Sequence, residues 1–150
     1  MTEKKRVLFL CTGNACRSQM AEGWARRLQS DRYEVFSAGV KPKGLDPRAV
    51  KAMAEAGVDI SIHQSKDMTA LGETEFDYVV TLCGNAQENC PYFPAKTKLL
   101  HKGFDDPPCL AEGARNEEEA MVPYRRVRDQ IRDFIQNLPF ELDDPEETGG

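Results

Sequence analysis

The chain has 150 residues, of which 40% are hydrophobic and 30% charged, and its formal net charge is −5. This composition indicates one globular domain, and no apolar run approaches the ~20 residues that a membrane helix needs. The net charge is carried by the acidic residues after position 138, which are Glu141, Asp143, Asp144, Glu146 and Glu147. The remaining body is neutral, which argues against a nucleic-acid-binding or membrane-binding surface.

Apolar runs alternate with helical patterns along the chain. The patterns predict strands over 6–10, 34–37, 78–82 and 97–100, and helices over 18–30, 46–56 and 122–138. We expect an extended segment at 58–62, a short helix within 65–71, helical turns at 84–90 and a loop over 103–109. Such alternation predicts an α/β fold, a three-layer sandwich whose four-stranded parallel sheet has helices on both faces.

The ends of the chain set its expected boundaries. Residues 1–138 are interpreted as a single domain, and the acidic segment 139–150 as a disordered tail. The N-terminus has no long apolar core of the kind that signal peptides carry, so we expect a cytoplasmic protein. The charged face of the last helix, which includes Arg125, Arg128 and Arg132, is interpreted as solvated surface.

The number and spacing of the cysteine and histidine residues argue against structural disulfides and against a metal site. The five cysteines are an odd number, and no Cys-x-x-Cys pair occurs among them. His63 and His101 are not at metal-ligand spacing, so no metal is required. Reactive thiols are the better interpretation for at least some of the cysteines.

One loop joins the first strand to the first helix. Its residues are Cys11-Thr12-Gly13-Asn14-Ala15-Cys16-Arg17-Ser18. A strand end, a glycine-containing loop and a helix start direct backbone N–H groups and the helix dipole at one point, which suits a tetrahedral oxyanion. The same groups and the Arg17 guanidinium favour the thiolate of Cys11. We expect residues 12–18 to bind the oxyanion, Arg17 to grip two of its oxygens, and Ser18 to donate to the thiolate.

This loop, together with Asp106-Pro107, resembles the low-molecular-weight protein tyrosine phosphatases. Two later stretches, Val80-Thr81-Leu82-Cys83-Gly84 and Glu88-Asn89-Cys90-Pro91, resemble the thioredoxin-coupled arsenate reductases built on that fold. The likeness covers about residues 6–136. It implies a cytoplasmic enzyme with no tightly bound cofactor that reduces arsenate, with phosphate or sulfate as competing oxyanions and thioredoxin as its partner. We expect it to be a monomer.

The resemblance also implies a role for each thiol. Cys11 attacks arsenate, and Asp106 protonates the leaving oxygen, with Asp105 as the second choice. Cys83 then attacks Cys11 and releases arsenite, and Cys90 attacks Cys83. Thioredoxin reduces the resulting Cys83–Cys90 disulfide.

The spacing of the last two thiols implies a movement. If residues 84–90 are helical, the two Cα atoms lie about 10 Å apart, beyond the ~7 Å limit of a disulfide. We therefore expect this helix to unwind on oxidation. Cys16 is interpreted as a packing residue and Cys109 as a bystander.

A cation site is the point at which the sequence departs from the resemblance. Many relatives bind potassium through residues that match Asn14, Glu22 and Ser37, and through an aspartate shortly after a His-x-Ser segment. Here Lys66 stands after that segment, so we expect its ammonium to replace the cation. Two alternatives stay open: Lys66 is an ordinary surface lysine, or Asp67 restores the site.

Two other functions compete with arsenate reduction. A low-molecular-weight tyrosine phosphatase or small phosphate-ester hydrolase would use Cys11, Arg17 and Asp106 unchanged. It would have no use for Cys83 and Cys90, and Pro107-Pro108-Cys109 lacks the aromatic residue expected beside a phosphotyrosine ring. A non-enzymatic redox or oxyanion sensor is the second alternative.

Overall fold

The computed structural model describes residues 4–11, 16–39, 43–71, 75–82 and 97–142. Its strands are β1 Lys5–Cys11, β2 Tyr33–Gly39, β3 Tyr78–Thr81 and β4 Lys98–His101. Its helices are α1 Arg17–Leu28, α2 Pro47–Glu55, α4 Pro107–Leu110, α5 Glu117–Gln136 and α6 Leu138–Glu141, with a 3₁₀ helix, η1, at Met68–Leu71. The strands form one parallel sheet in the order β2-β1-β3-β4, so β1 is paired on both sides.

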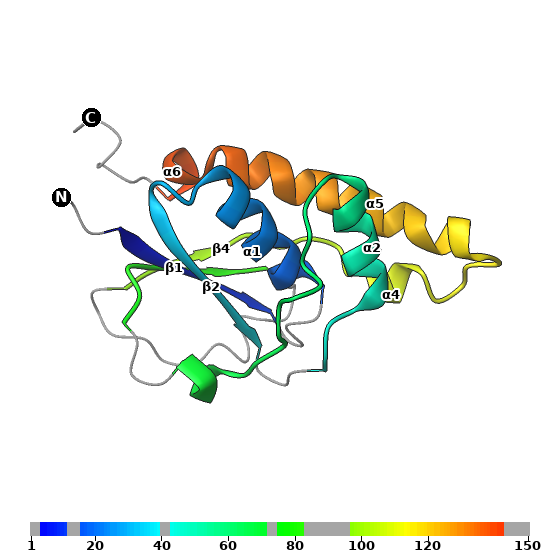
Figure 1. Ribbon diagram of the computed structural model, residues 1–150, viewed down its shortest axis with the longest axis horizontal. Coiled ribbons are helices and arrows are strands. Elements are labelled where there is room, and N and C mark those ends of the chain that lie inside the picture. The colour runs from blue at the N-terminus through cyan, green and yellow to red at the C-terminus, as the bar shows by residue number, and fades with distance from the viewer. Residues whose placement is uncertain (1–3, 12–15, 40–42, 72–74, 83–96, 143–150) are drawn as a thin grey trace.

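The helices α1, α2 and α5 cover one face of the sheet (Figure 1). Alternate residues of β1 explain the two layers of core: Val7 and Phe9 belong to the large cluster under these helices, while Leu8 and Leu10 belong to a smaller one on the other face. Within the described residues, that smaller cluster is covered by Phe76 and by Leu71 of η1. The predicted α/β fold with a four-stranded parallel sheet is confirmed.

Most differences from the sequence-based predictions lie at element ends. Residues 58–60 belong to no strand and are followed by a turn, and the short helix within 65–71 is the 3₁₀ helix η1. The segment 103–109 was predicted as a loop, but its last residues form α4, which begins at Pro107. Proline fits this first helical position because its missing N–H has no intrahelical partner there. The helical turns expected at 84–90 lie outside the described residues.

The last long helix begins earlier than predicted. Helix α5 starts at Glu117, because the Asn116 side chain accepts a hydrogen bond of 2.8 Å from the Glu119 N–H. Pro123 lies inside this helix. Beyond this helix, α6 and the fully buried Leu142 extend the packed body past residue 138.

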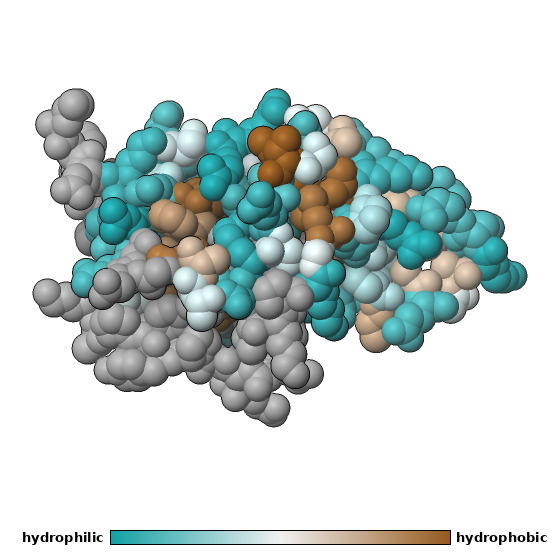
Figure 2. Space-filling view, turned by 60° about the horizontal axis from the view of Figure 1, so that its bottom comes forward, coloured by the Kyte–Doolittle hydropathy of each residue, from teal (hydrophilic) through white to brown (hydrophobic). Residues whose placement is uncertain are grey.

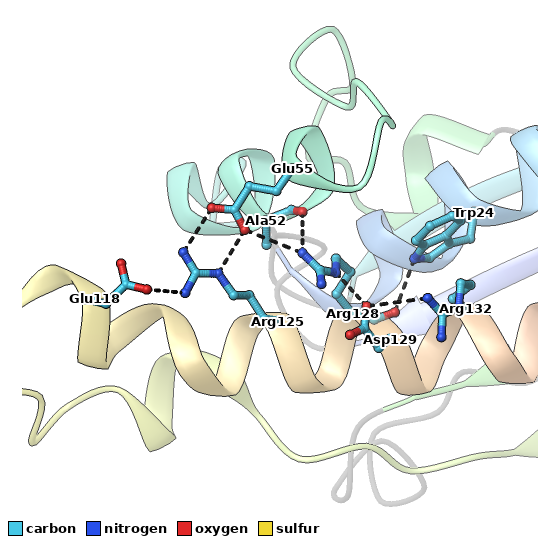
Figure 3. A network of polar contacts seen from close by, with 8 residues as sticks. All are labelled: Trp24, Ala52, Glu55, Glu118, Arg125, Arg128, Asp129 and Arg132. Atoms are coloured by element: carbon cyan, nitrogen blue, oxygen red, sulfur yellow. Dashed lines mark hydrogen bonds and ion pairs between the residues drawn. The ribbon is translucent and has the colours of Figure 1, made fainter.

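The prediction that the charged face of α5 is merely solvated is wrong. Arg125 donates to both carboxylate oxygens of Glu55 on α2, at 2.8 and 3.0 Å, as Figure 3 shows. Arg128 donates to the Ala52 carbonyl at 3.0 Å, and the Trp24 indole of α1 donates to the Arg128 carbonyl at 3.2 Å. These bonds tie α5 to α2. Arg125 and Arg128 are only 29% and 14% exposed, so this part of the charged face is partly buried.

Glu55→Gln is expected to lower the melting temperature by no more than about 2–4 °C, because a partly exposed ion pair is screened by water. Its bonds to Arg125 hold the pKa of Glu55 below its usual range. The contribution is therefore full above the unfolded-state pKa and is lost as the pH falls through the lower folded-state pKa. Melting curves at pH 7 and at progressively lower pH should show the wild-type advantage shrinking as the pH falls. Glu118→Gln, at a 76% exposed position, is the control and should change little.

Hydrophilic residues cover most of the described part of the face in Figure 2, and hydrophobic residues gather there in small groups. None of the helices within the described ranges is both long and apolar enough to cross a membrane.

Candidate active site

The candidate site lies where the parallel strands end. Cys11 is the last residue of β1, and α1 begins at Arg17, so the strand end and the helix start flank the predicted loop. Its inner residues 12–15 lie outside the described residues, as do Cys83 and Cys90. Leu82 follows β3, and its N–H donates to the Leu10 carbonyl at 2.9 Å. The described parts of the site thus gather at one edge of the sheet, as the fold class requires.

Cys11 and Ser18 are in direct contact. The Cys11 Sγ lies 3.0 Å from the Ser18 Oγ, and both residues are buried, at 3% and 0% exposure. When Cys11 is a thiolate, the Ser18 hydroxyl must be the donor, because the thiolate has no proton. The Ser18 hydroxyl is therefore close enough to donate directly to this sulfur.

Arg17 is held by the segment that follows β4. One terminal nitrogen of its guanidinium donates to the Phe104 carbonyl at 2.9 Å. The other lies 3.6 Å from Asp106 Oδ1, close enough for an ion pair. Arg17 is only 9% exposed. The structure thus brings Arg17 and Asp106 together.

The two neighbouring aspartates differ in their partners. Asp105 Oδ2 accepts from Arg126 of α5 at 3.1 Å, and both side chains are exposed. Asp106 is half exposed and faces Arg17. Asp105 therefore pairs with a surface arginine, which leaves Asp106 as the stronger candidate for an acid at the oxyanion.

Cys16, the last residue of the loop before α1, is a buried thiol. Burial raises its pKa well above the usual range, and the nearby Asp46 carboxylate raises it further. Asp46 caps α2 through the Arg48 N–H and accepts the Tyr124 hydroxyl at 2.7 Å. Cys16 is therefore a neutral thiol, which agrees with a packing role. Cys109 on α4 is exposed.

A buried polar network lies behind the loop. The Gln19 amide donates to the Gln64 carbonyl at 3.0 Å, so its oxygen faces His63 Nδ1 at 2.9 Å as the acceptor. Burial lowers the pKa of His63, which keeps this imidazole neutral at pH 7. Gln19 is fully buried, and the network fixes the first turn of α1.

Glu22, one of the expected cation ligands, is part of the same network. Its Oε1 accepts from the Ser37 hydroxyl at 2.5 Å, and its Oε2 accepts from Arg26 Nε at 2.8 Å. Its carboxylate is 5% exposed, so the Arg26 guanidinium supplies a counter-charge that a buried carboxylate needs. The structure therefore brings Glu22 and Ser37 together.

The two residues after the His-x-Ser segment have separate partners. The Lys66 ammonium donates to the Gln64 carbonyl at 3.0 Å. Asp67 Oδ1 accepts from the Thr69 hydroxyl and from the Thr69 and Ala70 N–H groups, which lowers its pKa. Asp67 is thus a cap for η1. Among the described residues, no group of three or more His, Cys, Asp or Glu side chains could hold a metal ion.

Three residues of the site were missed by the sequence reasoning. Arg26 could have been found, because Glu22 and Arg26 have the i,i+4 spacing of a helical ion pair. Gln19 and Phe104 carry no comparable signal. Gln19 donates to the main-chain carbonyl of Gln64, and Phe104 accepts from Arg17 through its own main-chain carbonyl, and both bonds join residues far apart in the sequence.

Comparisons with known proteins agree with this geometry. The family model described as low molecular weight phosphotyrosine protein phosphatase matches residues 6–147. An arsenate reductase of Bacillus licheniformis is 50% identical over 135 residues, which are 90% of this chain and 95% of that protein. A solved arsenate reductase in the phosphate binding state has a TM-score of 0.71 and 30% identity, over 92% of this chain and 98% of that one. A thioredoxin-dependent arsenate reductase of Corynebacterium glutamicum has a TM-score of 0.67 and 25% identity, over 95% of this chain and 63% of that one.

Proposed function

Since the chain belongs to the low molecular weight phosphotyrosine protein phosphatase family, and its curated relatives are arsenate reductases, we propose that it reduces arsenate to arsenite with thioredoxin as the electron donor. The contact of 3.0 Å between Cys11 and Ser18 beside a buried arginine supports the oxyanion chemistry, and the 50% identity to an arsenate reductase over 90% of this chain favours arsenate reduction over phosphate-ester hydrolysis. A thiol with its own donor, next to a guanidinium at a helix start, suits attack on a bound oxyanion.

The first step forms a covalent adduct. The Cys11 thiolate attacks the arsenic atom, and one arsenate oxygen leaves as water with a proton from Asp106. The Arg17 guanidinium and the loop amides balance the negative charge of the oxyanion. The distance of 3.6 Å between Asp106 and Arg17 supports a location of this residue beside the bound oxyanion.

The second step makes the reaction a reduction. Cys83 attacks the sulfur of Cys11, the S–As bond breaks, and its electron pair stays on arsenic, which leaves as arsenite. The two thiols lose two electrons and form a Cys11–Cys83 disulfide. Cys90 then attacks Cys83 and frees Cys11, and thioredoxin reduces the Cys83–Cys90 disulfide. Leu82, the residue before Cys83, is hydrogen-bonded to Leu10, the residue before Cys11. This proximity supports the attack of Cys83 on Cys11.

One assay separates this function from its alternatives. Thioredoxin, thioredoxin reductase, NADPH and arsenate are mixed with the protein, and NADPH oxidation is followed. We expect turnover that disappears in Cys83→Ser and in Cys90→Ser. Hydrolysis of a phosphate ester that survives both substitutions, without arsenate-dependent NADPH oxidation, would instead identify a phosphatase. The absence of both activities would leave the redox or oxyanion sensor.

Potassium should not be needed. We propose that fixed cations replace it: Lys66 stands where the relatives' aspartate would, and Arg26 already balances Glu22 at 2.8 Å. Activity and melting temperature should therefore be equal in potassium and sodium chloride of the same ionic strength. Lys66→Asp is the matched variant and should gain a potassium-specific stabilisation. A large potassium effect on the wild type would contradict the proposal.

We place the enzyme in the cytoplasm as a monomer. Thioredoxin and the reducing conditions of that compartment keep its thiols available. Gel filtration of the reduced protein, at a mass near 16.8 kDa, tests the monomer.

A further inference from the structure

The main chain of Phe104 joins two parts of the site. Its N–H donates to the Leu82 carbonyl at 2.9 Å, at the end of β3. Its carbonyl accepts from the Arg17 guanidinium at 2.9 Å. One residue therefore connects the strand end before Cys83 with the arginine that grips the oxyanion.

The ring of Phe104 fixes this residue to α5. It packs edge-to-face against Phe134, with ring centroids 6.0 Å apart and an angle of 67° between the planes. The Lys102 ammonium lies 5.9 Å from the Phe104 centroid and 6.0 Å from that of Phe134, within the range of a cation–π interaction. Residues 102–106 belong to no helix or strand, so this aromatic contact anchors a segment without regular structure.

We propose that Phe104 is a positioning residue for Arg17 in the oxyanion site. This inference rests on the proposed function only in that the site must bind an oxyanion. Its ring holds the 102–106 segment against α5, and its carbonyl then fixes one end of the Arg17 guanidinium. The other end stays between the oxyanion and Asp106. Without the ring, the carbonyl loses its fixed position, and Arg17 is free to pair more closely with Asp106, which lies only 3.6 Å away. The cation and the acid would then neutralise each other.

Because the Phe104 ring lies at the surface of the core, its effect on phosphate binding can be tested separately from its effect on folding. Phe104 is half-buried and lines an open hollow of about 520 Å³ together with Lys102 and Phe134. Truncating it leaves no closed cavity, so the loss of stability should be modest. Phe36 offers a matched control. It is also half-buried and also packs edge-to-face, against Phe76 with centroids 5.3 Å apart, but it belongs to the smaller core cluster on the other side of the sheet.

The test is phosphate binding to the reduced protein by isothermal titration calorimetry. Phe104→Ala should bind phosphate about tenfold more weakly, the effect of losing one oriented charge-assisted contact. Phe104→Leu, which keeps apolar volume and secures a folded variant, should fall between it and the wild type. Phe104→Tyr keeps the ring and should restore binding. Phe36→Ala should lower the melting temperature by about as much as Phe104→Ala does, and it should leave the affinity for phosphate within about twofold of the wild type.

Steady-state kinetics with arsenate give the second measurement. Phe104→Ala should raise KM about tenfold and change kcat less, because the thiol and its serine are untouched. Wild-type affinity in Phe104→Ala, failure of Phe104→Tyr to restore it, or an equal loss in Phe36→Ala would each overturn the proposal. A wild-type protein that binds phosphate without reducing arsenate would reject the proposed function and leave the binding test intact.

Discussion

Replacing Cys11 with serine is expected to abolish arsenate reduction, with a loss of turnover on the order of a thousandfold or more. An alcohol in the same buried position cannot form a stable anion at neutral pH, so it cannot attack arsenic as the thiolate does. The serine also cannot form the disulfide that the proposed mechanism needs in order to reduce arsenic. The measurement is NADPH oxidation coupled through thioredoxin at saturating arsenate.

Cys109→Ser is the matched control for this change. Cys109 is an exposed thiol on α4, just past the aspartates, so its substitution removes a sulfur near the site without removing the nucleophile. Its turnover should stay within about twofold of the wild type, the range expected for a residue outside the reaction. Arsenate-dependent turnover in Cys11→Ser at more than a few per cent of wild type would show that another thiol is the nucleophile.

Asp106→Asn is expected to lower kcat for arsenate reduction by about 10²–10⁴-fold, the usual contribution of a general acid. The amide cannot give a proton to the leaving oxygen. Asp105→Asn should change kcat by no more than about twofold, since the Asp105 carboxylate pairs with the exposed Arg126 at 3.1 Å and contributes a surface ion pair.

The two aspartate variants are best compared side by side under the same conditions. If Asp106 is the acid, kcat should fall in Asp106→Asn and stay near the wild-type value in Asp105→Asn. A larger loss in Asp105→Asn than in Asp106→Asn would reverse the assignment. Phosphate affinity should be measured alongside, because Asp106 also lies within ion-pair distance of Arg17.

The sheet and the contact between Cys11 and Ser18 could be predicted because their signals are local. The apolar run from Val7 to Leu10 predicts a buried strand, and Cys11 follows it directly. The helical pattern that follows the loop predicts a helix start near Ser18, whose hydroxyl lies 3.0 Å from the Cys11 sulfur. The roles of Cys83 and Cys90 stay predictions, because both residues lie outside the described part of the chain.

The start of α5 was misplaced for a local reason. The prediction of a start at residue 122 followed the apolar pattern, although Asn116 and the three glutamates Glu117, Glu118 and Glu119 already had the pattern of a capped first turn. The helix tolerates Pro123 early in its length, where only one hydrogen bond is lost.

Other features depend on packing and no local pattern encodes them. The bond from Arg128 to the Ala52 carbonyl and the bond from Arg17 to the Phe104 carbonyl join residues far apart in the sequence. A main-chain carbonyl is present at every position, so the sequence cannot mark which one will accept. Such contacts become visible only after the elements are arranged in space.

The adjacency of β1 and β3 has a kinetic consequence. Their register pairs Leu10 with Thr81, and parallel strands lie about 4.8 Å apart, so the chain segments that lead to Cys11 and to Cys83 leave the sheet side by side. Folding has therefore already brought the two thiols' strands together before arsenate binds. If Cys83 attacks the adduct as proposed, its effective molarity there should be far above the millimolar range of free cellular thiols. A diffusing thiol such as glutathione should then lose the competition for the arsenic adduct, and the pairing of β1 with β3 would favour an internal route for the electrons.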